Sequence, residues 1–409
     1  MDSVWISVLT LMLQTAGLVV EHPGIAQLRE AAEDGNEMAQ YELAARHWQG
    51  AGVKMDAAEA MTWFRAAADQ GYVPAQWAMA LHYYHGNGVD KDIEEAYKWI
   101  RLLAEQDDAD AQYLMGMLYF PGEENIIRAD IAETLKWVRR SAEQGCADAQ
   151  FLLGGCYYSG DGVEKNLTEA NIWWRKAAAQ GNAGAQYGVG LCYSQGDGVT
   201  QDHIEAAKYF RMAAEQGHAE AQNKLGLYHY RGFGFGKDEA EAVKWFKAAA
   251  EQGIAESQFL LGVCYLESLG VGEDFAEAVK WSRKAAEQGH AGAQSNLGNC
   301  YLYGHGIGKD GAEAVKWFRK AAAQGHSPAQ YNLGLCYMTG DGVEENPVEA
   351  VAWWRKSAAQ GNAGAQCNLG LCYVRGAGVK EDTAEALTWL KKAAAQGDER
   401  AKEALKQMQ

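Results

Sequence analysis

The chain has 409 residues, a formal net charge of −17 and a sequence pI of about 5.1. This acidic balance disfavours a nucleic-acid backbone as the main partner, because phosphate binders cluster lysine and arginine. It favours basic or apolar protein partners instead. Hydrophobic residues make up 48% of the sequence, which is typical of a globular chain rather than a disordered one.

Residues 1–24 contain an apolar run from Val4 to Val20 that is short for a membrane span. Two interpretations stay open. Residues 1–17 resemble a secretory signal, although Asp2 precedes the run and no lysine or arginine does. Alternatively, the segment is an apolar helix that caps the first repeat. We expect a cytoplasmic protein, with export to the periplasm or secretion as the alternative, and membrane contact only if the segment is retained.

An Ala-Gln pair recurs along the chain from Ala39, with Ser-Gln in one place. The spacing is 36 residues, except for 38 between Ala111 and Ala149. Such self-similarity predicts a solenoid, which grows by stacking units rather than around one closed core. We divide the chain into the apolar segment 1–24, an N-terminal half-repeat at 25–36, ten repeats at 37–397 and a C-terminal capping helix at 398–409.

Each repeat predicts two helices. The first starts two residues before the Ala of the pair and carries its apolar residues on one helical face. It ends at a G-x-G-V turn such as Gly160 to Val163, where the first glycine suits a left-handed residue after a helix. The second begins with Asp or Asn followed three residues later by Glu, as in Asp56 and Glu59, which is typical of a capping box.

Glycine and tryptophan recur at fixed places in the predicted core. A glycine such as Gly116 lies inside the first helix, where it costs about 1 kcal/mol relative to alanine. We therefore expect a neighbouring helix to approach too closely there for a side chain. A tryptophan such as Trp137 recurs in the second helix, and we expect these rings to fill the core.

Six cysteines are separated by multiples of 36 residues and therefore occupy one position of the repeat. Stacked helices place equivalent atoms roughly 9–10 Å apart, whereas a disulfide needs Cα atoms within roughly 7 Å. We expect small buried thiols and, weakly, a reducing compartment. The six are Cys156, Cys192, Cys264, Cys300, Cys336 and Cys372.

The pattern A-x-A-Q-x-x-L-G-x-x-Y-x-x-G-x-G-V-x-x-D-x-x-E-A-x-x-W-x-x-K-A-A-x-Q-G resembles the Sel1-like repeat family, and residues 183–217 and 327–361 match it almost throughout. The resemblance implies an all-α, tetratricopeptide-like fold, a right-handed α-α superhelix or solenoid of ten 36-residue helix–turn–helix repeats. It also implies adaptor roles in assembling protein complexes, in bacteria often in envelope functions or contact with host proteins. The paired cysteines and penicillin-related activity of some bacterial relatives do not carry over.

In such a solenoid the first helices line the concave face. The positions expected to face away from the core are aromatic in the N-terminal half, and Tyr and Trp are typical binding hot spots. In the C-terminal half an asparagine recurs, which offers both a donor and an acceptor to an extended peptide. Ordinary residues on a solvated face remain the alternative. The candidate protein-binding residues are Tyr41, Trp48, Trp77, Tyr84, Tyr113, Phe120, Phe151, Tyr158, Tyr187, Asn296, Asn332 and Asn368.

Repeat three departs from the pattern. It carries two extra residues between Tyr119 and Arg128, and it follows Asp107, which replaces a glycine. Insertions in repeat proteins map to loops and often to binding faces. Neutral drift explains the departure about as well.

Catalytic motifs are absent from the sequence: no HExxH, GxSxG or Walker pattern occurs. The histidines His47, His82 and His85 have no carboxylate or thiol in phase to complete a zinc site. We expect no cofactor, no metal and no nucleic acid. The predicted function is a monomeric, non-enzymatic scaffold that holds a protein or peptide segment. An exported protein that contacts envelope or host proteins, and an enzyme or enzyme subunit with a site in the groove, are the alternatives.

Overall fold

The structure is a computed structural model that describes residues 24–120 and 129–408. The apolar residues 1–23 and most of the repeat-three insertion lie outside the described residues, so the two interpretations of the N-terminal segment stay predictions. All regular secondary structure in the described ranges is α-helical. Within these ranges, no helix combines the length and the apolar character that crossing a bilayer requires.

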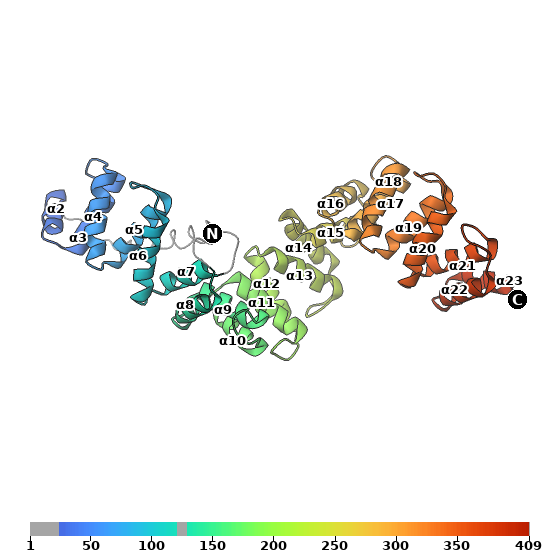
Figure 1. The fold of residues 1–409 in the computed structure, drawn as a ribbon, viewed down its shortest axis with the longest axis horizontal. Helices are drawn as coiled ribbons and strands as arrows, with labels where there is room; N and C mark the ends of the chain where they lie inside the picture. The colour runs from blue at the N-terminus through green and yellow to red at the C-terminus, as the bar shows by residue number, and fades with distance from the viewer. Residues whose placement is uncertain (1–23, 121–128, 409) are drawn as a thin grey trace. The chain divides into compact units, whose positions relative to one another are not determined.

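Consecutive helices pair into hairpins that stack side by side (Figure 1), which confirms an all-helical solenoid of ten repeats. Helix α2 (Ile25–Glu33) precedes the repeats and α23 (Glu399–Gln407) follows them. The first helices of the repeats are α3 (Glu37–Gln49), α5 (Val73–His85), α7 (Ala109–Tyr119), α9 (Ala147–Ser159), α11 (Ala183–Gln195), α13 (Ala219–Arg231), α15 (Ala255–Glu267), α17 (Ala291–Tyr303), α19 (Ser327–Thr339) and α21 (Ala363–Arg375). The second helices are α4 (Ala57–Asp69), α6 (Ile93–Glu105), α8 (Ile131–Glu143), α10 (Leu167–Ala179), α12 (His203–Glu215), α14 (Glu239–Glu251), α16 (Phe275–Glu287), α18 (Gly311–Ala323), α20 (Pro347–Ala359) and α22 (Thr383–Ala395).

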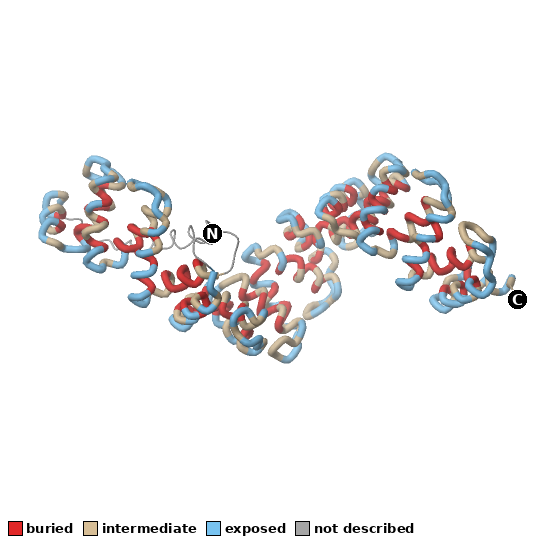
Figure 2. Tube along the Cα trace, viewed as in Figure 1, coloured by how far each residue is buried: buried red, intermediate tan, exposed pale blue. Residues whose placement is uncertain are grey.

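The chain divides into two compact units, Met1–Gln201 (unit 1) and Asp202–Gln409 (unit 2). Each unit is described by itself. In both, the buried residues lie where helices face one another, and the turns between helices are mostly exposed (Figure 2). Stacking thus provides each hairpin with the apolar contact area that it lacks alone.

The turn between the two helices of a repeat is closed by backbone bonds rather than by a capping box. The Asp56 carboxylate accepts the backbone N–H of Glu59 at 3.0 Å, as the sequence predicts. However, the Asp56 N–H donates to the carbonyl of His47 at the end of the preceding helix, at 3.0 Å. The glutamate of the pattern instead accepts from the indole N–H of the recurring tryptophan, as in Trp281 to Glu277 at 3.0 Å. The expected capping box is therefore only half formed.

The Ala-Gln pair marks a buried hydrogen-bonded chain that runs from repeat to repeat. Gln258 is buried, and its side-chain N–H donates to the carbonyl of Ala250 at 3.0 Å. Ala250 belongs to the preceding hairpin, and the side-chain carbonyl of Gln258 accepts from Gln288 at the end of its own hairpin, at 2.8 Å. Because buried amides cost free energy when unpaired, this link fixes the register of one repeat on the next. We call it the glutamine link.

Inside the first helix, the repeated glycine accommodates a large side chain of the second helix. A Cβ added to Gly298 would lie 2.6 Å from the ring of Phe318, and one added to Gly154 would lie 2.4 Å from Trp174. The expected close approach is thus confirmed, with a side chain as the nearest neighbour rather than a helix backbone.

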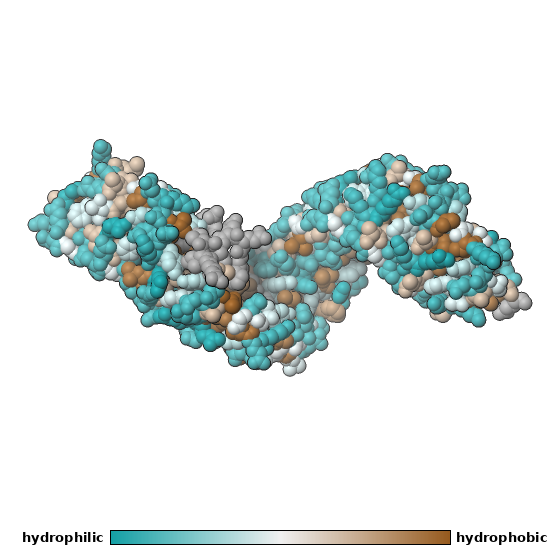
Figure 3. Space-filling view, in the orientation of Figure 1, coloured by the Kyte–Doolittle hydropathy of each residue, from teal (hydrophilic) through white to brown (hydrophobic). Residues whose placement is uncertain are grey.

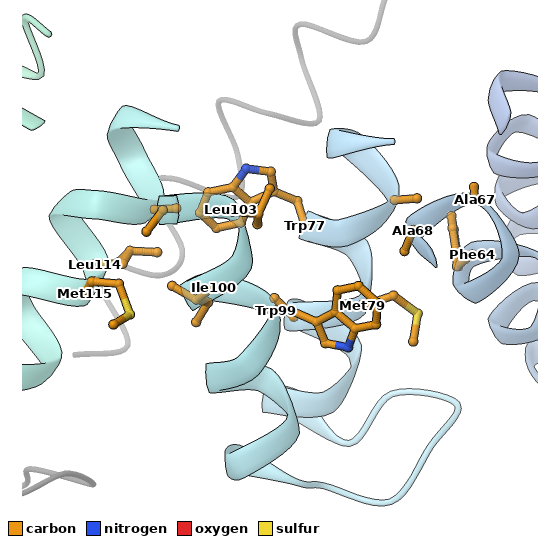
Figure 4. Close-up of a cluster of buried hydrophobic side chains, with 14 of the residues drawn as sticks. Phe64, Ala67, Ala68, Trp77, Met79, Trp99, Ile100, Leu103, Leu114 and Met115 are labelled. Carbon is orange, nitrogen blue, oxygen red and sulfur yellow. The ribbon is translucent and has the colours of Figure 1, made fainter. Parts of the chain in front are cut away.

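The residue that fills this space follows the recurring tryptophan. Phe318 is fully buried, whereas several of the tryptophans, Trp63 and Trp173 among them, are only half-buried. The prediction that the recurring tryptophans are the main core residues is therefore wrong in part. Figure 4 shows the core of unit 1, where the Trp99 ring lies beside Met79 and the next residue, Ile100, points the other way toward Leu114 and Met115.

The six in-phase cysteines are buried free thiols. Burial raises the pKa of Cys156 and of Cys336 to about 11. A thiol with a raised pKa is a poor nucleophile, so these side chains serve packing in this fold.

Candidate protein-interaction surface

The first helices of unit 1 place one residue of each repeat against the start of the next first helix. A Cβ added to Gly184 at the start of α11 would lie 2.9 Å from the Phe151 ring of α9. The same contact recurs in unit 2 between Phe259 and Gly292, at 3.1 Å. The aromatic residue of one repeat is thus covered or left open by the side chain that begins the next first helix.

This contact explains why the candidate aromatic residues differ in burial. Phe151 meets a glycine and stays 38% exposed. Trp77 and Tyr113 lie where the next first turn carries Asp110 and Asp148, and they are only 5% and 9% exposed. The Trp77 indole N–H also donates to Asp108 at 3.3 Å.

The expectation that all of these positions face away from the core is wrong for Trp77 and Tyr113. It also fails for Asn368, which is 8% exposed and accepts from Arg400 at 3.3 Å. These three side chains contribute mainly to packing, so the open surface consists of fewer residues than the sequence suggests.

The remaining aromatic candidates are half-buried. Tyr41 packs on Phe64 with ring centroids 5.5 Å apart, and Trp48 meets His82 edge-on at 4.3 Å. Tyr158 packs on Trp174 at 5.2 Å and donates its hydroxyl to Asp197 at 3.3 Å.

Three further aromatic candidates, Tyr84, Phe120 and Tyr187, are also half-buried. Tyr84 lies near the end of α5, and the Lys91 ammonium lies over its ring, 5.5 Å from the centroid. Phe120 follows the last residue of α7, and Tyr187 is half-buried on α11. We call Tyr84 of α5 and Phe151 and Tyr158 of α9 the aromatic surface, because these three side chains on first helices of unit 1 are not fully buried.

The asparagines of unit 2 form one direct link instead of a free ladder. Asn332 of α19 donates to Asn299 of α17 at 2.9 Å. Asn296 is half-buried and makes no hydrogen bond within the described ranges. With Asn368 bonded to Arg400, the amide groups open to a peptide are limited to Asn296, Asn299 and Asn332.

Two of the histidines considered for a zinc site, His47 and His82, take part in packing and hydrogen bonds. His47 is buried beside Arg29 and Glu59, with 3.2 Å and 3.5 Å between the nearest atoms. His82 bonds the carbonyl of Asn87 at 2.9 Å, and burial lowers its pKa. Across residues 24–120 and 129–408, no three His, Cys, Asp or Glu side chains gather as metal ligands would.

A sequence profile of the Sel1 repeat matches ten consecutive segments, residues 37–72, 73–108, 109–146, 147–182, 183–218, 219–254, 255–290, 291–326, 327–362 and 363–398. The chain belongs to the Sel1 repeat family. Sel1 repeat proteins are tetratricopeptide-like scaffolds that generally interact with other proteins, which agrees with the resemblance found in the sequence.

Two solved structures show the similarity of this Sel1 repeat protein to others along most of its length. It is 34% identical to c5321, a protective antigen present in uropathogenic Escherichia coli strains that displays an SLR fold, with a TM-score of 0.73 over 93% of this chain and 89% of that one. It is 35% identical to a Sel1 repeat protein from Oxalobacter formigenes, with a TM-score of 0.55 over 76% of this chain and 90% of that one. No functionally curated protein matches the sequence.

Sequence reasoning found the aromatic positions but missed the residues that cover them. Asp110, Asp148 and Gly184 occupy equivalent places one repeat apart. The signal was present in the residue one position before the Ala of each pair, which is acidic in some repeats and glycine in others. Only the contact between successive first helices shows what that position controls.

Proposed function

We propose that this Sel1 repeat protein is a non-enzymatic scaffold that holds a segment of a protein partner on the aromatic surface of unit 1. The observation that carries the proposal is Phe151, a large ring that the fold leaves 38% exposed on the middle of a first helix. Tyr84 and Tyr158 extend the accessible ring area on both sides along the chain. Aromatic side chains are rigid and lose little conformational entropy on binding, which makes them effective anchors.

The proposed scaffold is a monomer that binds through rigid side chains rather than by chemistry on a substrate. Supporting this, the periodic thiols are buried with raised pKa values, and the histidines are engaged in packing. An assay for bound metal or cofactor by elemental analysis and absorbance tests the non-enzymatic part of the proposal. A stoichiometric metal or chromophore in the purified chain would contradict it.

The direct test removes the accessible rings. Tyr84→Ala with Phe151→Ala is expected to weaken binding of a co-purified protein partner at least tenfold, which corresponds to about 1.4 kcal/mol. Tyr113 is left unchanged, because replacing a buried residue would mix loss of folding with loss of binding. Isothermal titration gives the dissociation constant, and circular dichroism checks the fold.

A matched control replaces two apolar residues of unit 1 on second helices. Leu102 and Ile172 are 38% and 42% exposed, so Leu102→Ala with Ile172→Ala removes similar accessible area outside the aromatic surface. This variant is expected to bind as the unaltered chain does. If the aromatic variant keeps every partner, or if both variants lose binding equally, the proposed surface is wrong.

The similarity to c5321 supports a second proposal about where the scaffold works. That protein is described as a protective antigen in uropathogenic strains, which suggests for this chain an exported scaffold that contacts envelope or host proteins. N-terminal sequencing of the mature protein tests this: a start near Leu18 establishes export, whereas an intact Met1 supports the cytoplasmic alternative.

A further inference from the structure

Two carboxylates lie at equivalent places on successive first helices, next to the aromatic surface. Asp110 is in the first turn of α7 and Asp148 in the first turn of α9. Each precedes an aromatic residue by three positions, so Asp110 shares a helix face with Tyr113, and Asp148 shares one with Phe151. Carboxylates and rings therefore alternate across the two helices.

These carboxylates have no cationic partner in the described parts of the chain. Asp110 makes no hydrogen bond or ion pair there, and Asp148 accepts only from the Asn182 amide, at 2.8 Å. Nearby, Asp108 is occupied by the backbone N–H of Ala111 at 2.9 Å and by the Trp77 indole. Burial raises the pKa of Asp110, and the charges of Asp108 and Asp148 raise it further. The negative charge at this place is thus not neutralised within the fold.

The side chain of Tyr113 lies close to one of these carboxylates, Asp148. Tyr113 is 9% exposed, and its hydroxyl makes no hydrogen bond within the described ranges. Burial raises the pKa of Tyr113, and Asp148 is close enough to raise it further. The side chain is held in place by packing, and its hydroxyl is left to accept a hydrogen bond from a donor outside the chain.

We propose that Asp110 and Asp148 receive a lysine or arginine side chain of the protein partner, whose aliphatic stem lies along the open Phe151 ring. This inference rests on the proposed function and specifies its occupant as a basic segment. The cation would pair with both carboxylates, donate to the Tyr113 hydroxyl oxygen and lie near an aromatic face, which are the three interactions that favour ammonium and guanidinium groups.

The geometry favours a side-chain cation over a metal ion. The two carboxylates come from different helices, and the residues described here place no third His, Cys, Asp or Glu with them in a metal-binding group. The apolar ring beside them matches the methylene stem of lysine or arginine. The chain's net charge of −17 would further speed the approach of a basic segment.

The test compares two double variants of the full chain that change the net charge equally. Asp110→Asn with Asp148→Asn removes the proposed site. Asp69→Asn with Glu143→Gln removes two exposed carboxylates of unit 1 at the ends of second helices. The probes are a short peptide of alternating lysine and leucine and its counterpart of alternating glutamate and leucine, and fluorescence anisotropy gives the affinities.

The first variant is expected to weaken binding of the lysine peptide about tenfold and the second less than about twofold. Added salt should reduce the difference between the two, and the glutamate peptide should bind none of the proteins. Equal losses in both variants, or no loss in the first, would overturn the inference.

A third variant separates this inference from the proposed function. If Tyr84→Ala with Phe151→Ala releases a co-purified partner while Asp110→Asn with Asp148→Asn retains it, the surface binds but its occupant is not cationic, and only the inference fails. If the aromatic variant retains the partner, the proposed function fails as well.

Discussion

The junction between repeats two and three differs from the junctions of unit 2 at a single residue. In unit 2, Gly217, Gly253 and Gly289 follow second helices with φ of 89° to 99°. The carbonyl of Gly217 accepts from Gln252 at 3.0 Å, and the glutamine link to Gln222 is formed at 2.8 Å. Asp107 takes this place between repeats two and three, with φ of 65°.

Gln252, which precedes Gly253, forms the glutamine link to Gln222, but Gln106, which precedes Asp107, does not form the equivalent link to Gln76. The next link along the chain, from Gln144 to Gln112, is formed at 2.8 Å. The side-chain carbonyl of Gln76 is buried without a hydrogen bond. Asp107 instead accepts from Gln112 at 3.2 Å and pairs with Arg140 at 2.6 Å. A residue with a Cβ is strained in the left-handed region, so the backbone does not follow the glycine geometry. The comparison teaches that one glycine per repeat keeps the buried link in register.

The same region departs from the pattern at its first helix. Helix α7 has 11 residues, whereas α5 and α9 have 13. The residue that follows α7 is Phe120, in an extended conformation with φ of −65° and ψ of 133°, whereas a left-handed glycine follows α5 and α9. Because stability in a repeat protein is a sum of local and nearest-neighbour terms, we expect this junction to open more readily than those of unit 2. It lies directly beside Asp110 and the aromatic surface.

Removing the glutamine link where it is complete should have the largest effect. Gln258→Leu removes one hydrogen bond from the Ala250 carbonyl and one from the Gln288 side chain, each of which keeps a bond to Gly253, and the loss is expected to cost about 2–3 kcal/mol. Gln76→Leu should cost about 1 kcal/mol less, because its side-chain carbonyl is already unpaired. Urea denaturation followed by hydrogen exchange at each junction measures both. Equal losses of stability in the two variants would contradict the difference between the two junctions.

Exchanging glycine and aspartate at the two junctions should have an intermediate effect on stability. Gly217→Asp forces a side chain into the left-handed region at φ of 89°, which is expected to cost about 1–2 kcal/mol. A Cβ there meets nothing within 4 Å, so the cost is conformational rather than steric. The reverse change, Asp107→Gly, should lower hydrogen exchange at the Gln76 junction. No change in exchange at either site would show that this residue does not control the link.

Lowering the pH should have a smaller effect on the free energy of unfolding. Three first helices of unit 2 have a histidine as their N-cap residue. His326 accepts the backbone N–H of Ala329 at 3.3 Å through its ring nitrogen, which requires the neutral form. Burial lowers the pKa of His326, and His290 lowers it further. The unfolded chain, with a histidine pKa of about 6.5, therefore takes up the proton first, and stability falls as the pH drops from about 7 to 5.

Asparagine at the same place should remove this dependence. Asn362 caps α21 in the same way, at 2.8 Å to Ala365, so His326→Asn keeps the cap without a titrating group. Between pH 7 and 5, the free energy of unfolding of the variant is expected to fall by up to about 1 kcal/mol less than that of the unaltered chain. Thermal melts at a series of pH values test this, and parallel curves would contradict it.

The repeat length, the helix pairing and the buried glycines follow from the sequence, because each depends on residues close together within one repeat. The glutamine link does not, since it also joins successive hairpins, as the bond from Gln258 to the carbonyl of Ala250 does. For the same reason the sequence located Trp77, Tyr113 and Phe151 on one helical face but not their differing burial. That burial depends on Asp110, Asp148 and Gly184 in the following repeat.

Hydrogen exchange of the full chain with and without a co-purified partner tests the proposed binding surface most directly. We expect slower exchange in α5, α7 and α9, whose side chains form the aromatic surface and the carboxylate pair. Protection confined to the second helices α6, α8 and α10, or to unit 2, would contradict the proposal.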